Sequence, residues 1–83
     1  MKEETRKGMA QVFNQVMGED MEAMMDTPID KSGITSLSFI KFIVAVEEQF
    51  DIEVDNQYLS LSQYETVGDF VEACGNIIDN YNN

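Results

Sequence analysis

The sequence lacks histidine and tryptophan, and its 83 residues include one cysteine and one proline. Without histidine or a second cysteine, no set of soft ligands is available for a zinc site. A serine or cysteine nucleophile would also have no imidazole as its base. The single cysteine, Cys74, cannot form an intramolecular disulfide. These absences argue against a zinc protein and against an enzyme, and Cys74 is predicted to be a buried apolar residue.

Basic residues are scarce. The chain has 5 lysines and arginines against 16 aspartates and glutamates, which gives a formal net charge of −11. Proteins bind nucleic acid phosphates through Lys and Arg, so a nucleic acid partner is not expected. The natural complement is a basic patch on another protein, and such encounters weaken as salt screens the charges.

The sequence has no long hydrophobic run. The longest, residues 42–46, is far shorter than the roughly 20 residues that cross a bilayer, and residues 1–5 lack the apolar stretch of a secretion signal. We therefore expect a cytoplasmic protein with no membrane contact. The length suits one domain, residues 1–83, and the initial Met together with the polar ending at residues 80–83 favours a free-standing protein.

A first amphipathic segment predicts a helix over residues 5–17, with Gly18 as its stop. Its apolar residues recur at helical spacing: Met9, Val12, Phe13, Val16 and Met17. Residues 19–32 are predicted to be a long loop, with Pro28 and Gly33 as loop markers. Three methionines in or near this loop could form one more turn or anchor it: Met21, Met24 and Met25.

A second helix is predicted to open at Thr35 or Ser36, which are both good N-cap residues, and to end at about Phe50. Eight apolar residues are expected on one broad buried arc: Leu37, Phe39, Ile40, Phe42, Ile43, Val44, Val46 and Phe50. Four residues are expected on the other side: Ser38, Lys41, Glu48 and Gln49.

A short third helix is predicted over residues 56–61. The last helix should begin after Thr66, whose hydroxyl and the side chain of Asp69 form a capping signature. Its apolar stripe comprises Val67, Phe70, Val71, Cys74, Ile77, Ile78 and Tyr81. The sequence thus predicts an all-α fold, a small four-helix bundle with three main helices and one short helix.

Ser36 is the candidate functional residue. It would lie at a helix N-terminus, where unpaired amides and the helix dipole stabilise a phosphate. The stretch Gly33-Ile34-Thr35-Ser36-Leu37, the following apolar helix and the segment Glu47-Glu48-Gln49-Phe50-Asp51-Ile52-Glu53-Val54 resemble the acyl and peptidyl carrier protein family. The match continues more loosely over residues 66–70.

This resemblance implies that Ser36 carries a 4′-phosphopantetheine arm from coenzyme A, on which acyl or aminoacyl intermediates are held as thioesters. The family usually has aspartate before this serine, where it helps the modifying transferase arrange its metal ion. Here Thr35 stands in that place. The change leaves open a dedicated transferase, slow modification or a lost site.

The resemblance also implies partners and a surface that they recognise. The expected partners are a phosphopantetheinyl transferase, an acyl- or aminoacyl-loading ligase or transferase, and condensing or tailoring enzymes with basic docking patches. The candidate recognition residues are Leu37, Lys41, Glu47, Glu48 and Glu53. We expect a monomer in a specialised fatty acid, polyketide or nonribosomal peptide pathway, whose cargo the partner enzymes choose.

Alternatives stay open for several of these residues. Ser36 could simply cap its helix, in an acidic helical interaction module that is never modified. Leu37 could be an ordinary core leucine. A calcium loop starting at Asp26 is excluded, because Pro28 stands where an oxygen ligand is needed and Leu37 stands where a glutamate is needed.

Overall fold

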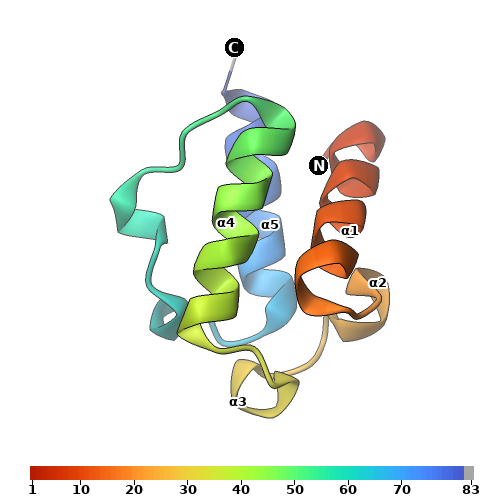
Figure 1. The fold of residues 1–83 in the computed structure, drawn as a ribbon, viewed down its shortest axis with the longest axis vertical. Coiled ribbons are helices and arrows are strands. Elements are labelled where there is room, and N and C mark those ends of the chain that lie inside the picture. The colour runs from red at the N-terminus through yellow and green to blue at the C-terminus, as the bar shows by residue number, and fades with distance from the viewer. Residues whose placement is uncertain (82–83) are drawn as a thin grey trace.

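The computed structural model describes residues 1–81, so Asn82 and Asn83 lie outside the described residues. Within residues 1–81 the chain forms five α-helices and two short 3₁₀ helices (Figure 1). In chain order they are α1 (Glu3–Met17), α2 (Met21–Met24), α3 (Ile29–Ser32), α4 (Ser36–Phe50), η1 (Asn56–Tyr58), η2 (Leu61–Gln63) and α5 (Val67–Asn80). The prediction of an all-α fold with three main helices is confirmed. None of the described helices is long and apolar enough to cross a membrane.

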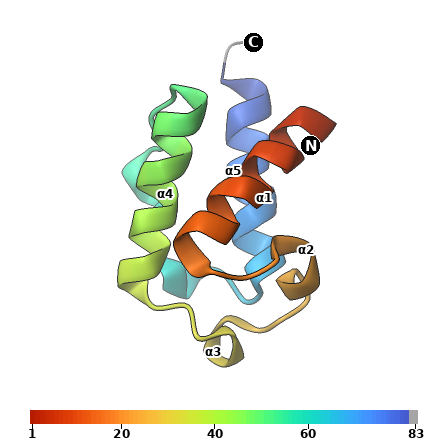
Figure 2. The same cartoon turned by 45° about the vertical axis from the view of Figure 1, so that its right-hand side comes forward.

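The three long helices, α1, α4 and α5, surround one hydrophobic core (Figures 1 and 2). α1 contacts both α4 and α5. The one-turn helices α2 and α3 lie toward the end of the bundle where α4 begins, and the segment with η1 and η2 runs beside α4 (Figure 1). The start of α4 is thus placed next to α3 at one end of the molecule.

Aromatic rings occupy the centre of the core. The Phe70 ring centroid lies 5.2 Å from that of Phe39 and 5.6 Å from that of Phe42. It also lies 6.1 Å from Tyr64 and 6.5 Å from Phe13. Each such pair contributes about 0.5–1.5 kcal/mol beyond the burial of its apolar area. Phe70 of α5 is therefore joined to α1, to α4 and to the segment before α5.

The predicted burial of α4 was wrong at Leu37, Ile40 and Val44, which are 65%, 38% and 45% exposed. At 100° per residue, Leu37 lies about 180° and Val44 about 160° from the fully buried Val46. The expected arc was too broad, because it included every apolar residue of the helix. Only its central part, which includes Phe39, faces the core.

The short third helix predicted over residues 56–61 is present only in part, as the 3₁₀ helix η1 at Asn56–Tyr58. A second 3₁₀ helix, η2, begins at Leu61, and side-chain hydrogen bonds from Gln63 and Tyr64 compete with a longer α-helix here. The Gln63 side-chain amide donates to the Gln57 carbonyl at 3.0 Å, and the Tyr64 hydroxyl donates to the Tyr58 carbonyl at 3.1 Å. These carbonyls are therefore not available to continue an α-helix.

The segment expected as a loop over residues 19–32 contains α2 and α3, and the fully buried Met21 anchors it. Backbone hydrogen bonds tie it to the start of α5. The Ile29 amide donates to the Glu65 carbonyl at 2.9 Å, and the Gly68 amide donates to the Met25 carbonyl at 2.8 Å. The loop therefore lies in a fixed position beside the last helix.

The predicted cap of α5 is confirmed. The Asp69 amide donates to the Thr66 hydroxyl at 3.2 Å, and the Asp69 carboxylate accepts from the Thr66 amide at 3.1 Å. Cys74 is buried on the same helix, as predicted. α1 begins at Glu3, two residues before the prediction, and Thr5 within it is buried and bonds to Asp79 of α5.

Asp79, near the end of α5, holds the start of α1 in place through hydrogen bonds. Its carboxylate accepts a hydrogen bond from the Thr5 hydroxyl at 2.6 Å and one from the Lys2 amide at 2.8 Å. The Met1 amino group lies 3.6 Å away. The Thr5 hydrogen bond, followed by the Lys2 amide and the nearby positive charges, lowers the pKa of Asp79 from its ordinary value.

Replacing Asp79 by Asn should lower the free energy of unfolding at pH 7, because the variant loses the ionised acceptor of both bonds. Folding lowers the pKa of Asp79, so its carboxylate stabilises the folded protein fully at pH values above the pKa that it has in the unfolded chain. This stabilisation is lost as the pH falls through the pKa that Asp79 has in the folded protein. The difference between wild type and Asp79→Asn should therefore shrink in acid. Urea unfolding over a range of pH measures it. The exposed Asp26→Asn is the control, and an equal loss in both variants would contradict the prediction.

Candidate functional site

The candidate residue Ser36 is the first residue of α4, and Thr35 before it is the N-cap. Thr35 has an extended backbone, with φ −100° and ψ 167°. The Ser38 amide donates to the Thr35 hydroxyl at 3.1 Å, and the Thr35 amide donates to the Ser38 hydroxyl at 2.9 Å. This reciprocal pair forms a capping box. The interpretation of Ser36 as the cap was therefore wrong.

Capping by Thr35 leaves the Ser36 hydroxyl free to react. Ser36 is exposed, and its side chain makes no hydrogen bond to any residue in the part of the chain that the structure describes. The backbone amides of Ser36 and Leu37 likewise have no acceptor among residues 1–81. A phosphate on Ser36 would lie close to both amides and to the positive end of the 15-residue helix α4. The residues present therefore fit a phosphodiester at this position.

An open groove of about 520 Å³ adjoins Ser36. It runs between α3, the start of α4 and the segment around η2. Its lining residues are Pro28, Ile29, Asp30, Ser36, Leu61, Ser62, Tyr64 and Glu65. The mixture of apolar and hydrogen-bonding side chains suits an arm that contains both methyl and amide groups. The sequence pattern did not find this groove, because it depends on contacts between segments that are far apart in the chain.

Among the predicted recognition residues, Leu37, Lys41 and Glu48 lie on one face of α4. Their positions fall within about 40° of one another around the helix, and all three side chains are exposed. Leu37 is 65% exposed, so its alternative interpretation as a core leucine was wrong. Val44 lies on the same face and is also exposed, which the sequence interpretation missed. We call Leu37, Lys41, Val44 and Glu48 the α4 strip.

The other two predicted residues lie apart from the α4 strip. Glu47 is half-buried, and its carboxylate accepts a hydrogen bond from the Val54 amide at 2.9 Å. Glu53 is exposed, and its amide donates to the Tyr81 hydroxyl at 3.3 Å. Glu47 thus holds the turn after α4 in place, while Glu48 and Glu53 present charge at that end of the helix.

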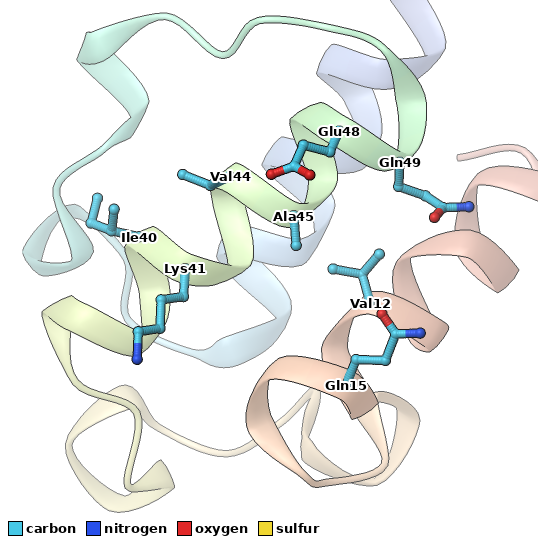
Figure 3. A pocket seen from close by; sticks show the side chains of 8 residues that line it. All are labelled: Val12, Gln15, Ile40, Lys41, Val44, Ala45, Glu48 and Gln49. Carbon is cyan, nitrogen blue, oxygen red and sulfur yellow. The ribbon is translucent and has the colours of Figure 1, made fainter.

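A second groove, of about 460 Å³, lies between α1 and α4 beside the α4 strip (Figure 3). Val12 and Gln15 of α1 form one wall. The α4 side contributes Ile40, Lys41, Val44, Ala45, Glu48 and Gln49. This face therefore combines exposed aliphatic groups with one cation and one anion, a combination found at protein interfaces.

The described residues hold no other cluster with evident chemistry. Within residues 1–81, no group of three or more metal-ligating side chains comes together. Cys74 is 3% exposed, and burial raises the pKa of its thiol to about 12. A thiol that stays protonated at neutral pH is a poor nucleophile.

Comparisons with known proteins identify a family for most of the chain. A family model described as the phosphopantetheine attachment site matches residues 7–74. A D-alanyl carrier protein of Lactobacillus helveticus (strain DPC 4571) is 27% identical over 64 residues, which cover 76% of this chain and 81% of that protein. A D-alanyl carrier protein of Lactobacillus acidophilus (strain ATCC 700396 / NCK56 / N2 / NCFM) matches with the same identity and coverage. No solved structure matches the chain.

The division of roles between Thr35 and Ser36 predicts different effects on stability. Ser36→Ala should change the free energy of unfolding by less than about 0.5 kcal/mol, because it removes an exposed hydroxyl that has no hydrogen bond to any of the described residues. Thr35→Ala should cost about 1 kcal/mol, because it removes the cap of α4. Urea unfolding measures both values. Thr35→Ser keeps a capping hydroxyl and is the control, and an equal loss in Ser36→Ala and Thr35→Ala would show that Ser36 also caps.

Proposed function

Because this chain belongs to the phosphopantetheine attachment site family, we propose that Ser36 carries its 4′-phosphopantetheine arm. The observation behind this assignment is an exposed hydroxyl at the start of a 15-residue helix, beside two amides, where none of the three groups has a hydrogen-bond partner among residues 1–81. When bound, the cofactor supplies a thiol that holds acyl groups as thioesters. The protein itself is a carrier and not an enzyme.

The residues around Ser36 have separate tasks in this proposal. The Ser36 oxygen would attack the phosphorus on the pantetheine side of the coenzyme A pyrophosphate and give up its proton to a base of the transferase. The P–O bond to the second phosphate would break, and adenosine 3′,5′-bisphosphate would leave. The amides of Ser36 and Leu37 offer donors to the phosphate. Thr35 keeps α4 intact before and after modification, because its capping bonds do not involve Ser36.

A carrier of this kind works by raising the concentration of a tethered intermediate at each partner's active site. Carrier proteins of the family work with a phosphopantetheinyl transferase and with loading and biosynthetic enzymes. We assign these tasks to one domain, residues 1–83, acting as a cytoplasmic monomer. The net charge of −11 supports partners with basic docking patches.

The cargo is an acyl or aminoacyl group in a specialised fatty acid, polyketide or nonribosomal peptide pathway, as the sequence suggested. The two Lactobacillus relatives are named for a D-alanyl group, which favours an aminoacyl cargo. D-alanine is therefore the first amino acid to test in a loading reaction with a partner ligase.

Partner enzymes are proposed to dock on the α4 strip and on the acidic end of α4. Leu37 lies next to Ser36, and Val44 extends the apolar surface two turns further along the same face. Lys41 and Glu48 flank this surface with opposite charges, and Glu53 adds a further acid beyond the helix. Glu47 supports this end through its bond to the Val54 amide. Such a surface would orient Ser36 toward the partner's active site.

The attachment site is tested by the intact mass of the protein after incubation with coenzyme A and a broad-specificity phosphopantetheinyl transferase. The wild type should gain the mass of one phosphopantetheine, because its Ser36 hydroxyl is exposed and unbonded. Ser36→Ala should gain nothing while remaining folded. Ser60→Ala is the control, since it removes an exposed hydroxyl that does not line the Ser36 groove, and it should still be modified.

Two further results of this assay bear on the proposal. Thr35→Asp restores the carboxylate that is usual in the family and keeps a good N-cap, so it should be modified several-fold faster. No mass gain with several transferases, in the wild type and in Thr35→Asp alike, would instead support an interaction module with an unmodified Ser36.

Leu37→Ala tests the docking surface. The value of kcat/KM for modification by the transferase should fall by about tenfold, because a central apolar contact contributes more than about 1 kcal/mol to an interface. Stability should change little, since Leu37 is 65% exposed. Initial rates at several carrier concentrations measure the effect. Gln11→Ala, at an exposed position on α1, is the control, and equal rates for the two variants would exclude Leu37 from the interface.

A further inference from the structure

We propose that the cargo of this carrier stays outside the helical core, so that the protein carries short or polar acyl groups and does not enclose a long alkyl chain. The inference rests on the proposed attachment at Ser36. It concerns the class of cargo, which the attachment site alone does not define. The observation behind it is the close packing of aromatic rings behind the Ser36 groove.

Tyr64 closes the inner side of the groove that adjoins Ser36. Its ring centroid lies 6.0 Å from that of Phe39 and 6.1 Å from that of Phe70. Its hydroxyl donates to the Tyr58 carbonyl at 3.1 Å. The ring is thus held by the core on its face and by the backbone at its tip, so it cannot swing aside without losing both sets of contacts.

The rings behind Tyr64 leave no path toward the centre of the bundle. Phe39 and Phe70 are 1% and 0% exposed, and their rings meet edge to face at 5.2 Å and 77°. Phe42 meets Phe70 at 5.6 Å and 70°. Close-packed interiors accept extra methylene groups only by straining side chains and backbone. A long chain from Ser36 would have to separate these rings in order to enter.

The groove at Ser36 is an open surface groove, so a long hydrocarbon chain lying in it would stay partly in water. Asp30, Ser62 and Glu65 contribute polar groups to its lining, so a covering alkyl chain would take hydrated groups out of water. A short acyl or aminoacyl group remains hydrated in the same place. The groove therefore suits the arm and a small cargo better than a fatty acyl chain.

The test compares the wild-type protein loaded at Ser36 with acetyl-phosphopantetheine and with decanoyl-phosphopantetheine, by transfer from acetyl-CoA and decanoyl-CoA. Intact mass first establishes that both groups are attached. Thermal unfolding and two-dimensional amide NMR spectra are then recorded for both forms. A chain bound in the native core would raise Tm, since binding to the folded state alone stabilises it.

We expect the two Tm values to agree within about 2 °C, and the amide signals of Phe39 and Phe70 to be the same in both forms. A decanoyl form whose Tm is several degrees higher, with shifted Phe39 and Phe70 signals, would overturn the inference while leaving the attachment site intact. A failure of both groups to attach would overturn the attachment at Ser36 and this inference with it.

Phe39→Ala is the positive control for the same test. Removing this ring opens space directly behind Tyr64, so the decanoyl form of the variant should be more stable than its acetyl form. Phe13→Ala is the matched control. It removes a ring from the α1 side of Phe70 and should show no difference between the two cargoes. If either variant fails to fold, the wild-type comparison still decides the question.

Discussion

The burial of Phe70 among four other rings is the contact on which the rest of this structure depends. Those rings come from α1, from α4 and from the segment that precedes α5, so one residue joins every long element of the chain. Phe39 is one of the four and lies within a turn of Ser36. The packing that stabilises the fold therefore also holds the first turn of α4, which contains Ser36, against the rest of the bundle.

The two sides of α4 serve different purposes as a result. One side packs in the aromatic core, while Leu37 and Val44 are exposed on the opposite side. Exposed aliphatic groups on a chain with a net charge of −11 would have little use in an isolated protein. Under the proposed function they would give each partner enzyme a small apolar contact, and the charge would attract such partners from a distance without holding them for long.

Local signals in the sequence predicted the long helices well. The Thr66 and Asp69 cap was predictable because its bonds span three residues, and Gly18 ends α1 through a left-handed backbone that suits glycine. Whether Thr35 or Ser36 capped α4 could not be decided, because either hydroxyl satisfies the local pattern. Leu37 and Val44 were misplaced because hydrophobicity alone does not show where a partner helix packs. The groove beside Ser36 depends on long-range bonds such as that between Ile29 and Glu65, which no local pattern encodes.

The separation of the cap, Thr35, from the proposed attachment residue, Ser36, has a practical consequence for chemical labelling. Ser36 can be replaced without removing any of the hydrogen bonds that cap α4. The native thiol, Cys74, is buried and stays protonated at neutral pH. A cysteine introduced as Ser36→Cys would then be the one thiol open to alkylation. Stable thioether mimics of a loaded arm could be attached there directly, without a transferase, to trap partner enzymes on the carrier.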